Sequence, residues 1–97
     1  MFEIFLTDQA KDQLHTLKAD RGLGKRFKAV KKTLQFLAAN PRHQGLKTHD
    51  YTSLKGPNGQ KVFEAYAEQS TSAAYRIFWY YGPGPKAITI IAITRHP

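Results

Sequence analysis

The sequence predicts an α+β domain in which two helices pack on one face of a β-sheet. A run of aromatic and β-branched residues at 74–81 is typical of a central strand. Apolar residues recur at spacings of three and four between residues 23 and 37, as they do on one side of a helix. The order of segments, a strand, two helices and then three antiparallel strands joined by turns, indicates helices segregated to one face of the sheet.

The N-terminal half of the chain carries clear start and stop signals for its elements. Phe2–Leu6 is a short β-type run, and Thr7 after it can cap a helix. That helix ends near Arg21-Gly22, where glycine favours a helix terminus. A second helix is expected over Gly24–Ala39, and Asn40-Pro41 stops it.

The C-terminal half begins with a long polar connection, residues 40–59, which we expect to lack regular structure. Connections of this length are uncommon in compact domains and often carry function. Strands are then expected over 61–68, 74–81 and 88–94. The sheet is therefore assigned mainly to the C-terminal half.

Length and composition limit the kinds of function that this protein can have. The chain of 97 residues is expected to form a single domain, 1–97, and it has no cysteine, which excludes disulfides and thiolate metal sites. We find no leader and no apolar segment of membrane-spanning length, so we expect a soluble, cytoplasmic protein with no membrane partner. The formal charge of +8 attracts polyanions, which indicates nucleic acid or an acidic protein as a partner.

Much of the positive charge falls on the expected helical hairpin. We interpret this basic face as an electrostatic footprint on RNA or on an acidic partner, the alternative being a merely solvated surface. The residues are Lys11, Lys18, Arg21, Lys25, Arg26, Lys28, Lys31 and Lys32.

One arginine lies inside the expected central strand. Because side chains alternate along a strand, Arg76 shares its face with Phe78 and Tyr80. One interpretation is a guanidinium stacked on these rings with its head in water. The other is a fixed cation for a phosphate, which guanidinium binds bidentately.

Several short phrases occur together in a familiar order. They are Asn40–His43 closing the second helix, Leu46–His49, Leu54–Gly56, Tyr75–Ile77 in the middle strand, and a last strand running into Arg95-His96. With these phrases and its element order, the chain resembles the RelE/ParE superfamily of toxins from bacterial toxin–antitoxin modules, over nearly its whole length.

The resemblance implies two activities and one partner. RelE-like members are metal-independent ribonucleases that cut mRNA, typically in the ribosomal decoding site, whereas ParE-like members poison DNA gyrase without nuclease activity. Both are held inactive by an antitoxin, usually acidic in the segment that binds the toxin. We therefore expect a toxin that is an mRNA endoribonuclease needing no cofactor, with a gyrase inhibitor or a non-toxic basic RNA- or protein-binding module as alternatives.

The resemblance also implies candidate catalytic residues. Cutting RNA without a metal requires a base for the 2′-hydroxyl proton, cations for the phosphorane and an acid for the leaving 5′-oxygen. Arg76 matches the mid-strand arginine that contacts the scissile phosphate in RelE-like nucleases. His96 and His49 match positions at which relatives keep proton-transfer histidines, the alternatives being a frayed terminus for His96 and a structural hydrogen bond for His49. Glu64 is a possible base if its strand face is the one shared with Arg76.

A second group of residues is expected to bind substrate through charge or by stacking on a base. These residues are Arg42, Lys47, Tyr51, Lys55 and Arg95. No metal site is expected, because the four histidines have no cysteine or carboxylate at ligand spacing.

Overall fold

The computed structural model describes residues 1–68 and 74–95, which form two α-helices and a five-stranded sheet. The expected helix over residues 24–39 is confirmed to the residue. In chain order the elements are β1 (Glu3–Leu6), α1 (Asp8–Ala19), the 3₁₀ turn η1 (Arg21–Leu23), α2 (Gly24–Ala39), the 3₁₀ turn η2 (Gln44–Leu46), β2 (His49–Lys55), β3 (Lys61–Tyr66), β4 (Tyr75–Tyr81) and β5 (Ala87–Arg95).

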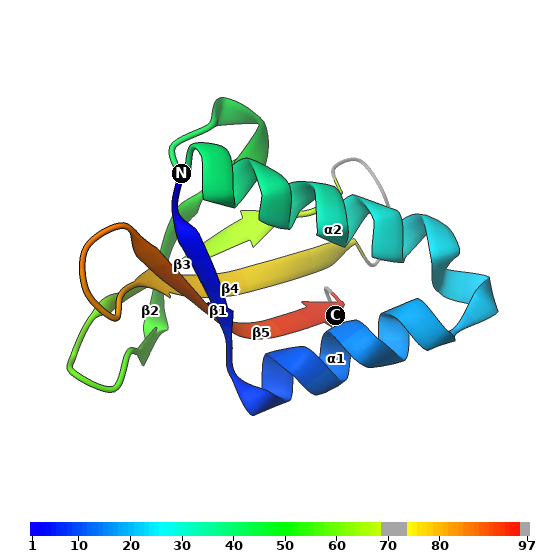
Figure 1. Ribbon diagram of the computed structural model, residues 1–97, viewed down its shortest axis with the longest axis horizontal. Coiled ribbons are helices and arrows are strands. Elements are labelled where there is room, and N and C mark those ends of the chain that lie inside the picture. The colour runs from blue at the N-terminus through cyan, green and yellow to red at the C-terminus, as the bar shows by residue number, and fades with distance from the viewer. Residues whose placement is uncertain (69–73, 96–97) are drawn as a thin grey trace.

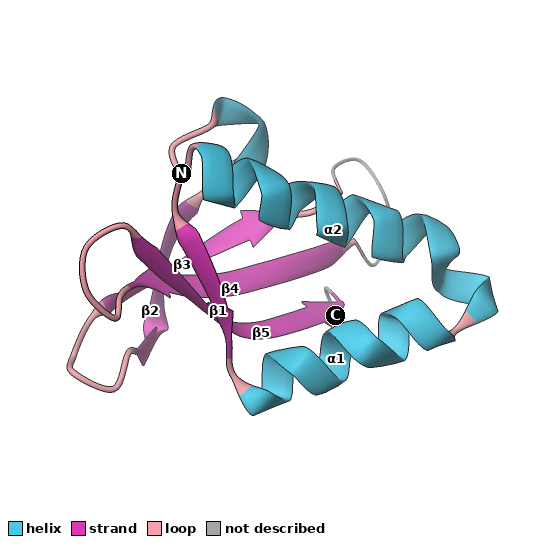
Figure 2. Cartoon of the chain, viewed as in Figure 1, coloured by secondary structure: helices cyan, strands magenta, loops and turns pink. Residues whose placement is uncertain are grey.

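The sheet is mixed and has the strand order β1-β5-β4-β3-β2. β4 is the middle strand, as its composition predicts, and it pairs antiparallel with both β3 and β5. β1 lies at one edge and runs parallel to β5. The two helices lie side by side across one face of this sheet (Figures 1 and 2), which leaves the other face without a helix. The predicted α+β architecture is confirmed.

The expectation of an irregular connection over residues 40–59 is wrong. This segment contains η2 and the whole of β2, so four strands follow the helices instead of three. β2 is an edge strand whose residues are nearly all exposed, and its backbone pairs with β3 at His49↔Glu64 and Asp50↔Phe63. Such a strand is held by backbone hydrogen bonds and lacks the apolar alternation by which strands are recognised in a sequence.

The predicted cap of α1 is present and also joins the helix to the sheet. Thr7 Oγ1 accepts a hydrogen bond from the backbone N–H of Ala10 at 3.1 Å and donates one to the carbonyl of Ile91 at 2.8 Å. A side-chain oxygen at this position satisfies one of the backbone donors that a helix N-terminus leaves unpaired. Thr7 therefore fixes both the start of α1 and its position against β5.

The core divides into two parts, one on each face of β4. Ile77 and Trp79 point toward the helices, where Val30 of α2 packs in the same cluster. Phe78 and Tyr80 belong to a smaller cluster on the face that carries no helix. The predicted alternation along β4 is therefore confirmed. In the described residues, no helix is long and apolar enough to cross a membrane.

Candidate functional site

Three ionisable side chains from three adjacent strands meet on the helix-free face of the sheet. Glu64 of β3 lies between the other two: its Oε2 accepts a hydrogen bond from Arg76 Nη1 at 2.7 Å, and its Oε1 lies 3.1 Å from His49 Nε2. We call Arg76, Glu64 and His49 the sheet cluster. Glu64 and Arg76 share one face of the sheet, which is the condition for Glu64 to be a candidate base.

Strand register brings these residues together. His49 of β2 lies directly opposite Glu64, and Arg76 of β4 lies opposite Tyr66, two residues further along β3. Directly opposed residues share a face, as do residues two apart on one strand. A shift of one residue in either pairing would turn one member toward the helices.

Burial differs strongly within the cluster. The exposed fraction of the side chain is 7% for Glu64, 17% for Arg76 and 53% for His49. Glu64 is therefore held under its two partners, and His49 is the member most open to a ligand. A carboxylate this buried requires partners, which Arg76 and His49 supply.

Arg76 stacks on an aromatic ring, as one interpretation of its sequence position expected, but its head is paired with a carboxylate and largely buried. Its guanidinium carbon lies 5.0 Å from the centre of the Phe78 ring, a cation–π arrangement, and its Nη1 binds Glu64. Its Nε is buried and has no hydrogen-bond partner in the part of the chain that the structure describes. The guanidinium is thus fixed in place with donor capacity left over.

The cluster has a defined donor and acceptor order. An ionised carboxylate only accepts hydrogen bonds, so Glu64 favours the tautomer in which His49 Nε2 carries the proton. His49 Nδ1 is then left with a lone pair that can accept a proton. This is the relation by which a buried carboxylate orients a histidine base in catalytic triads.

The remaining predicted residues lie at different places. Tyr51 is on the same face as the cluster, and the centre of its ring lies 4.7 Å from the centre of the Phe78 ring. Lys55 lies opposite Lys61 at the far end of β2. Arg95 lies beside α1 on the helix side of β5, so the structure does not bring it to the cluster.

His96 lies outside the described residues. Among the described residues, there is no group of three or more His, Cys, Asp or Glu side chains that could hold a metal ion.

Arg42 and Lys47 lie on the helix side of the sheet. They line a cavity of about 550 Å³ together with the aromatic residues Phe63, Trp79 and Tyr81. The sequence indicated the two cations but not the aromatic wall, because Phe63 and Trp79 follow the pattern of ordinary core residues. Their side chains are brought beside the loop after α2 only by the fold.

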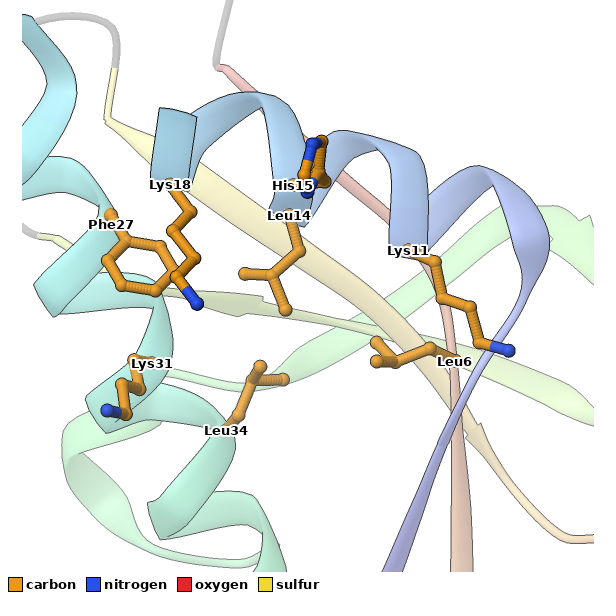
Figure 3. A pocket seen from close by; sticks show the side chains of 8 residues that line it. All are labelled: Leu6, Lys11, Leu14, His15, Lys18, Phe27, Lys31 and Leu34. Carbon is orange, nitrogen blue, oxygen red and sulfur yellow. The ribbon is translucent and has the colours of Figure 1, made fainter. Parts of the chain in front are cut away.

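The basic helical hairpin also encloses a groove. Leu14 of α1 and Phe27 and Leu34 of α2 converge in it, and the amino groups of Lys18 and Lys31 lie at its rim (Figure 3). The groove has a volume of about 360 Å³. An apolar floor with a cationic rim is suited to an acidic amphipathic segment.

Comparison with known proteins identifies the architecture. A scan against protein-family models and a search of the curated proteins both find no match. Solved structures do match. A YoeB/ParE toxin from Agrobacterium tumefaciens has a TM-score of 0.71 at 11% identity, covering 99% of this chain and 100% of that one. The chain has the RelE/ParE toxin fold.

Toxins bound to their antitoxins are among the structures with the same RelE/ParE fold. The archaeal RelE–RelB complex from Pyrococcus horikoshii has a TM-score of 0.65 at 13% identity, covering 97% of this chain and 93% of that one. The intact E. coli RelBE toxin–antitoxin complex has a TM-score of 0.63 at 12% identity, covering 100% of this chain and 99% of that one. At such low sequence identity, the structural similarity supports the RelE/ParE fold that the sequence resemblance implied. It does not show the chemistry, which depends on the residues of the site.

Proposed function

We propose that the protein is the toxin of a toxin–antitoxin module and that it cleaves mRNA without a metal ion. The observation that carries the proposal is the sheet cluster: a fixed guanidinium and a solvent-accessible imidazole held by one buried carboxylate. A protein that only occludes gyrase has no need of such an arrangement. The cluster therefore favours the RelE-like activity over the ParE-like one.

The cluster supplies two of the three parts that the reaction requires. His49 Nδ1 accepts the proton of the 2′-hydroxyl, whose oxygen then bonds to phosphorus. Arg76 donates hydrogen bonds to the non-bridging oxygens as negative charge develops on them. Glu64 touches no substrate atom in this scheme; it orients His49 and stabilises the imidazolium.

The third part is an acid for the leaving group. As the bond from phosphorus to the 5′-oxygen breaks, that oxygen takes a proton and leaves as a hydroxyl, and the other fragment ends in a 2′,3′-cyclic phosphate. We assign this proton to His96, the residue that the family resemblance indicates for it. Tyr51 and Lys55, on the strand that carries His49, are proposed to contact the RNA on either side of the cleaved bond.

Primer extension on translated mRNA, after brief induction of the toxin, tests the proposal. We expect His49→Gln and His96→Gln each to lower cleavage by roughly 10²–10⁴-fold, the range for loss of a general acid or base. Arg76→Lys should lower cleavage by about 10²-fold or more, because an ammonium lacks the planar fork of guanidinium. Arg95→Lys makes the same exchange on the opposite side of the sheet and is the matched control.

Gyrase supercoiling is measured in parallel on the same samples. If His49→Gln and Arg76→Lys arrest growth as the parent does, with mRNA intact and supercoiling lost, the nuclease proposal is wrong and the ParE-like activity is correct. If mRNA and supercoiling are both unaffected by the parent protein, the chain is a non-toxic binding module. Circular dichroism of each variant checks that the fold is retained.

The antitoxin is proposed to bind the groove of the helical hairpin. The comparison structures include toxins with their antitoxins, and the groove offers an apolar floor with a rim of lysines. An acidic amphipathic segment would pair its carboxylates with that rim. We expect its affinity to fall steeply with salt, and Lys18→Ala with Lys31→Ala to weaken it; an affinity independent of salt would show a mainly apolar contact instead.

A further inference from the structure

A second potential site lies on the helix side of the sheet, in the cavity beside Arg42 and Lys47. Its wall is aromatic: the rings of Phe63 and Trp79 lie 4.8 Å apart at 30°, and the Tyr81 ring stands edge-on to Trp79 at 5.0 Å. The cavity has a volume of about 550 Å³, within the range of small-ligand sites. It belongs neither to the sheet cluster nor to the groove between the helices.

The two cations at this cavity are available to a ligand. Arg42 and Lys47 are both exposed, and neither forms an ion pair with any residue in the two described ranges. Lys47 adopts the left-handed conformation, with φ 50° and ψ 40°, which is uncommon for a residue with a side chain. Lys47 ends η2, and a left-handed residue is common at a helix C-terminus, so this conformation fixes where the Lys47 side chain leaves the loop.

Two buried polar atoms at the cavity lack partners. Trp79 is 1% exposed, and its Nε1–H has no hydrogen-bond acceptor within residues 1–68 and 74–95. The hydroxyl of Thr48, on the loop that faces the aromatic wall, is likewise buried without a partner. Neither atom is open to the cavity, so the groups that a ligand meets there are the two cations and the rings of the aromatic wall.

We propose that this cavity binds a nucleotide, with the base against the aromatic wall and the phosphate between Arg42 and Lys47. Aromatic faces accept any base, and guanidinium binds phosphate in a bidentate manner. The chemistry required of the ligand is therefore a planar ring joined to an anion.

The adjacency of the two sites indicates an RNA strand as the source of the nucleotide, which rests on the proposed nuclease function. Lys47 and Thr48 at the cavity immediately precede His49 of the sheet cluster, and Phe63 immediately precedes Glu64. The two sites therefore lie back to back near β2, which is an edge strand. A single strand passing round this edge places one nucleotide in the cavity while another part of the strand lies over the cluster.

The single tryptophan of the chain reports on the cavity directly. We would titrate the protein with AMP, UMP, inorganic phosphate and a 2′-O-methyl hexanucleotide, which has no free 2′-hydroxyl and is not cleaved, and measure tryptophan fluorescence. We expect saturable quenching by the mononucleotides, weaker binding of phosphate alone, and at least tenfold tighter binding of the hexanucleotide. Arg42→Ala and Lys47→Ala should each weaken mononucleotide binding about tenfold.

Two further variants separate this site from the nuclease. Arg21→Ala removes an exposed arginine of the basic helical hairpin, outside the cavity; it is the charge control for the mononucleotide titrations only and should bind AMP and UMP like the parent. His49→Gln should bind nucleotides normally although its cleavage is impaired. If nucleotides quench the tryptophan fluorescence but the parent protein cleaves no mRNA, the proposed nuclease function is wrong and the proposed nucleotide site in the cavity is still supported.

Three results would overturn the proposal. One is an absence of saturable quenching at about 1 mM mononucleotide. Another is quenching by mononucleotides that Arg42→Ala and Lys47→Ala do not weaken more than Arg21→Ala does. The third is phosphate binding as tight as AMP binding, which would show an anion site with no place for a base. A hexanucleotide that binds no tighter than AMP would overturn the assignment to an RNA strand and identify a free nucleotide as the ligand.

Discussion

The ion pair between Arg76 and Glu64 should stabilise the fold far more than a surface pair does. The perturbation is a double-mutant cycle built from Glu64→Gln, which keeps the shape of the side chain, and Arg76→Met, which keeps much of its apolar length. Each single change leaves one partner largely buried without its counter-charge, and the double change removes both charges. The cycle therefore measures the coupling between the two side chains.

The magnitude follows from distance and burial. Arg76 Nη1 and Glu64 Oε2 are 2.7 Å apart, with only 17% and 7% of the two side chains exposed. Two unit charges about 4 Å apart attract by roughly 4 kcal/mol at an effective dielectric constant of about 20. Desolvation of both groups offsets part of this attraction, so we expect a coupling free energy of about 2 kcal/mol.

The chain contains a matched control for this measurement. Asp50 of β2 and Lys61 of β3 also form a cross-strand ion pair, at 3.2 Å, but their side chains are 50% and 60% exposed. The cycle of Asp50→Asn with Lys61→Met should give a coupling of less than about 1 kcal/mol, the usual range for exposed pairs.

Urea unfolding followed by circular dichroism provides the assay. With a denaturant slope of about 1 kcal/mol per molar urea, Glu64→Gln should lower the unfolding midpoint by roughly 2 M. The double variant with Arg76→Met should lose about 2 kcal/mol less than the sum of the two single losses, which corresponds to about 2 M urea. Equal coupling energies in the buried cycle and in the Asp50–Lys61 cycle would refute the reasoning, because burial would then make no difference to the pair.

Two further predictions concern the scaffold that holds the cluster. Thr7→Ala should lower the free energy of unfolding by about 1–2 kcal/mol, since the helix cap and the hydrogen bond to the Ile91 carbonyl are both lost, whereas Thr7→Ser should lower it by much less in the same urea assay. Ile77→Ala should cost about 2–5 kcal/mol, because this side chain is fully buried beneath the helices. Half-buried Ile91 is the control, and an equal loss from Ile91→Ala would contradict the assignment of the main core to the helix side.

Much of this fold could be predicted from local sequence signals. The threonine before α1 and the Asn-Pro pair after α2 act on the backbone of their own neighbours, so their effect does not depend on the rest of the chain. The alternation along β4 is local too, and it correctly separated Ile77 from Arg76 and Phe78. Signals of this kind predict elements and faces wherever the element has one apolar side.

β2 and the composition of the sheet cluster depend on information that is not local. β2 has no apolar side, since it pairs only at one edge and its residues are mostly exposed, so its sequence resembles that of a loop. Whether Glu64 meets Arg76 depends on the register between β3 and β4, and whether it meets His49 depends on a strand that was not expected. Residue types alone therefore left the role of Glu64 open.

The fold also places the expected catalytic and substrate-binding cations on different faces of the sheet. The charge of Arg76 is balanced by Glu64, so the sheet cluster contributes little to the long-range field and acts at short range through hydrogen bonds. Arg42 and Lys47 carry no such counter-charge in the described chain and lie on the other side of the sheet. In the proposed function, attraction of an RNA strand and the chemistry on it therefore belong to different faces of the sheet. Because side chains alternate along a strand, consecutive residues such as Phe63 and Glu64 can serve the two faces separately.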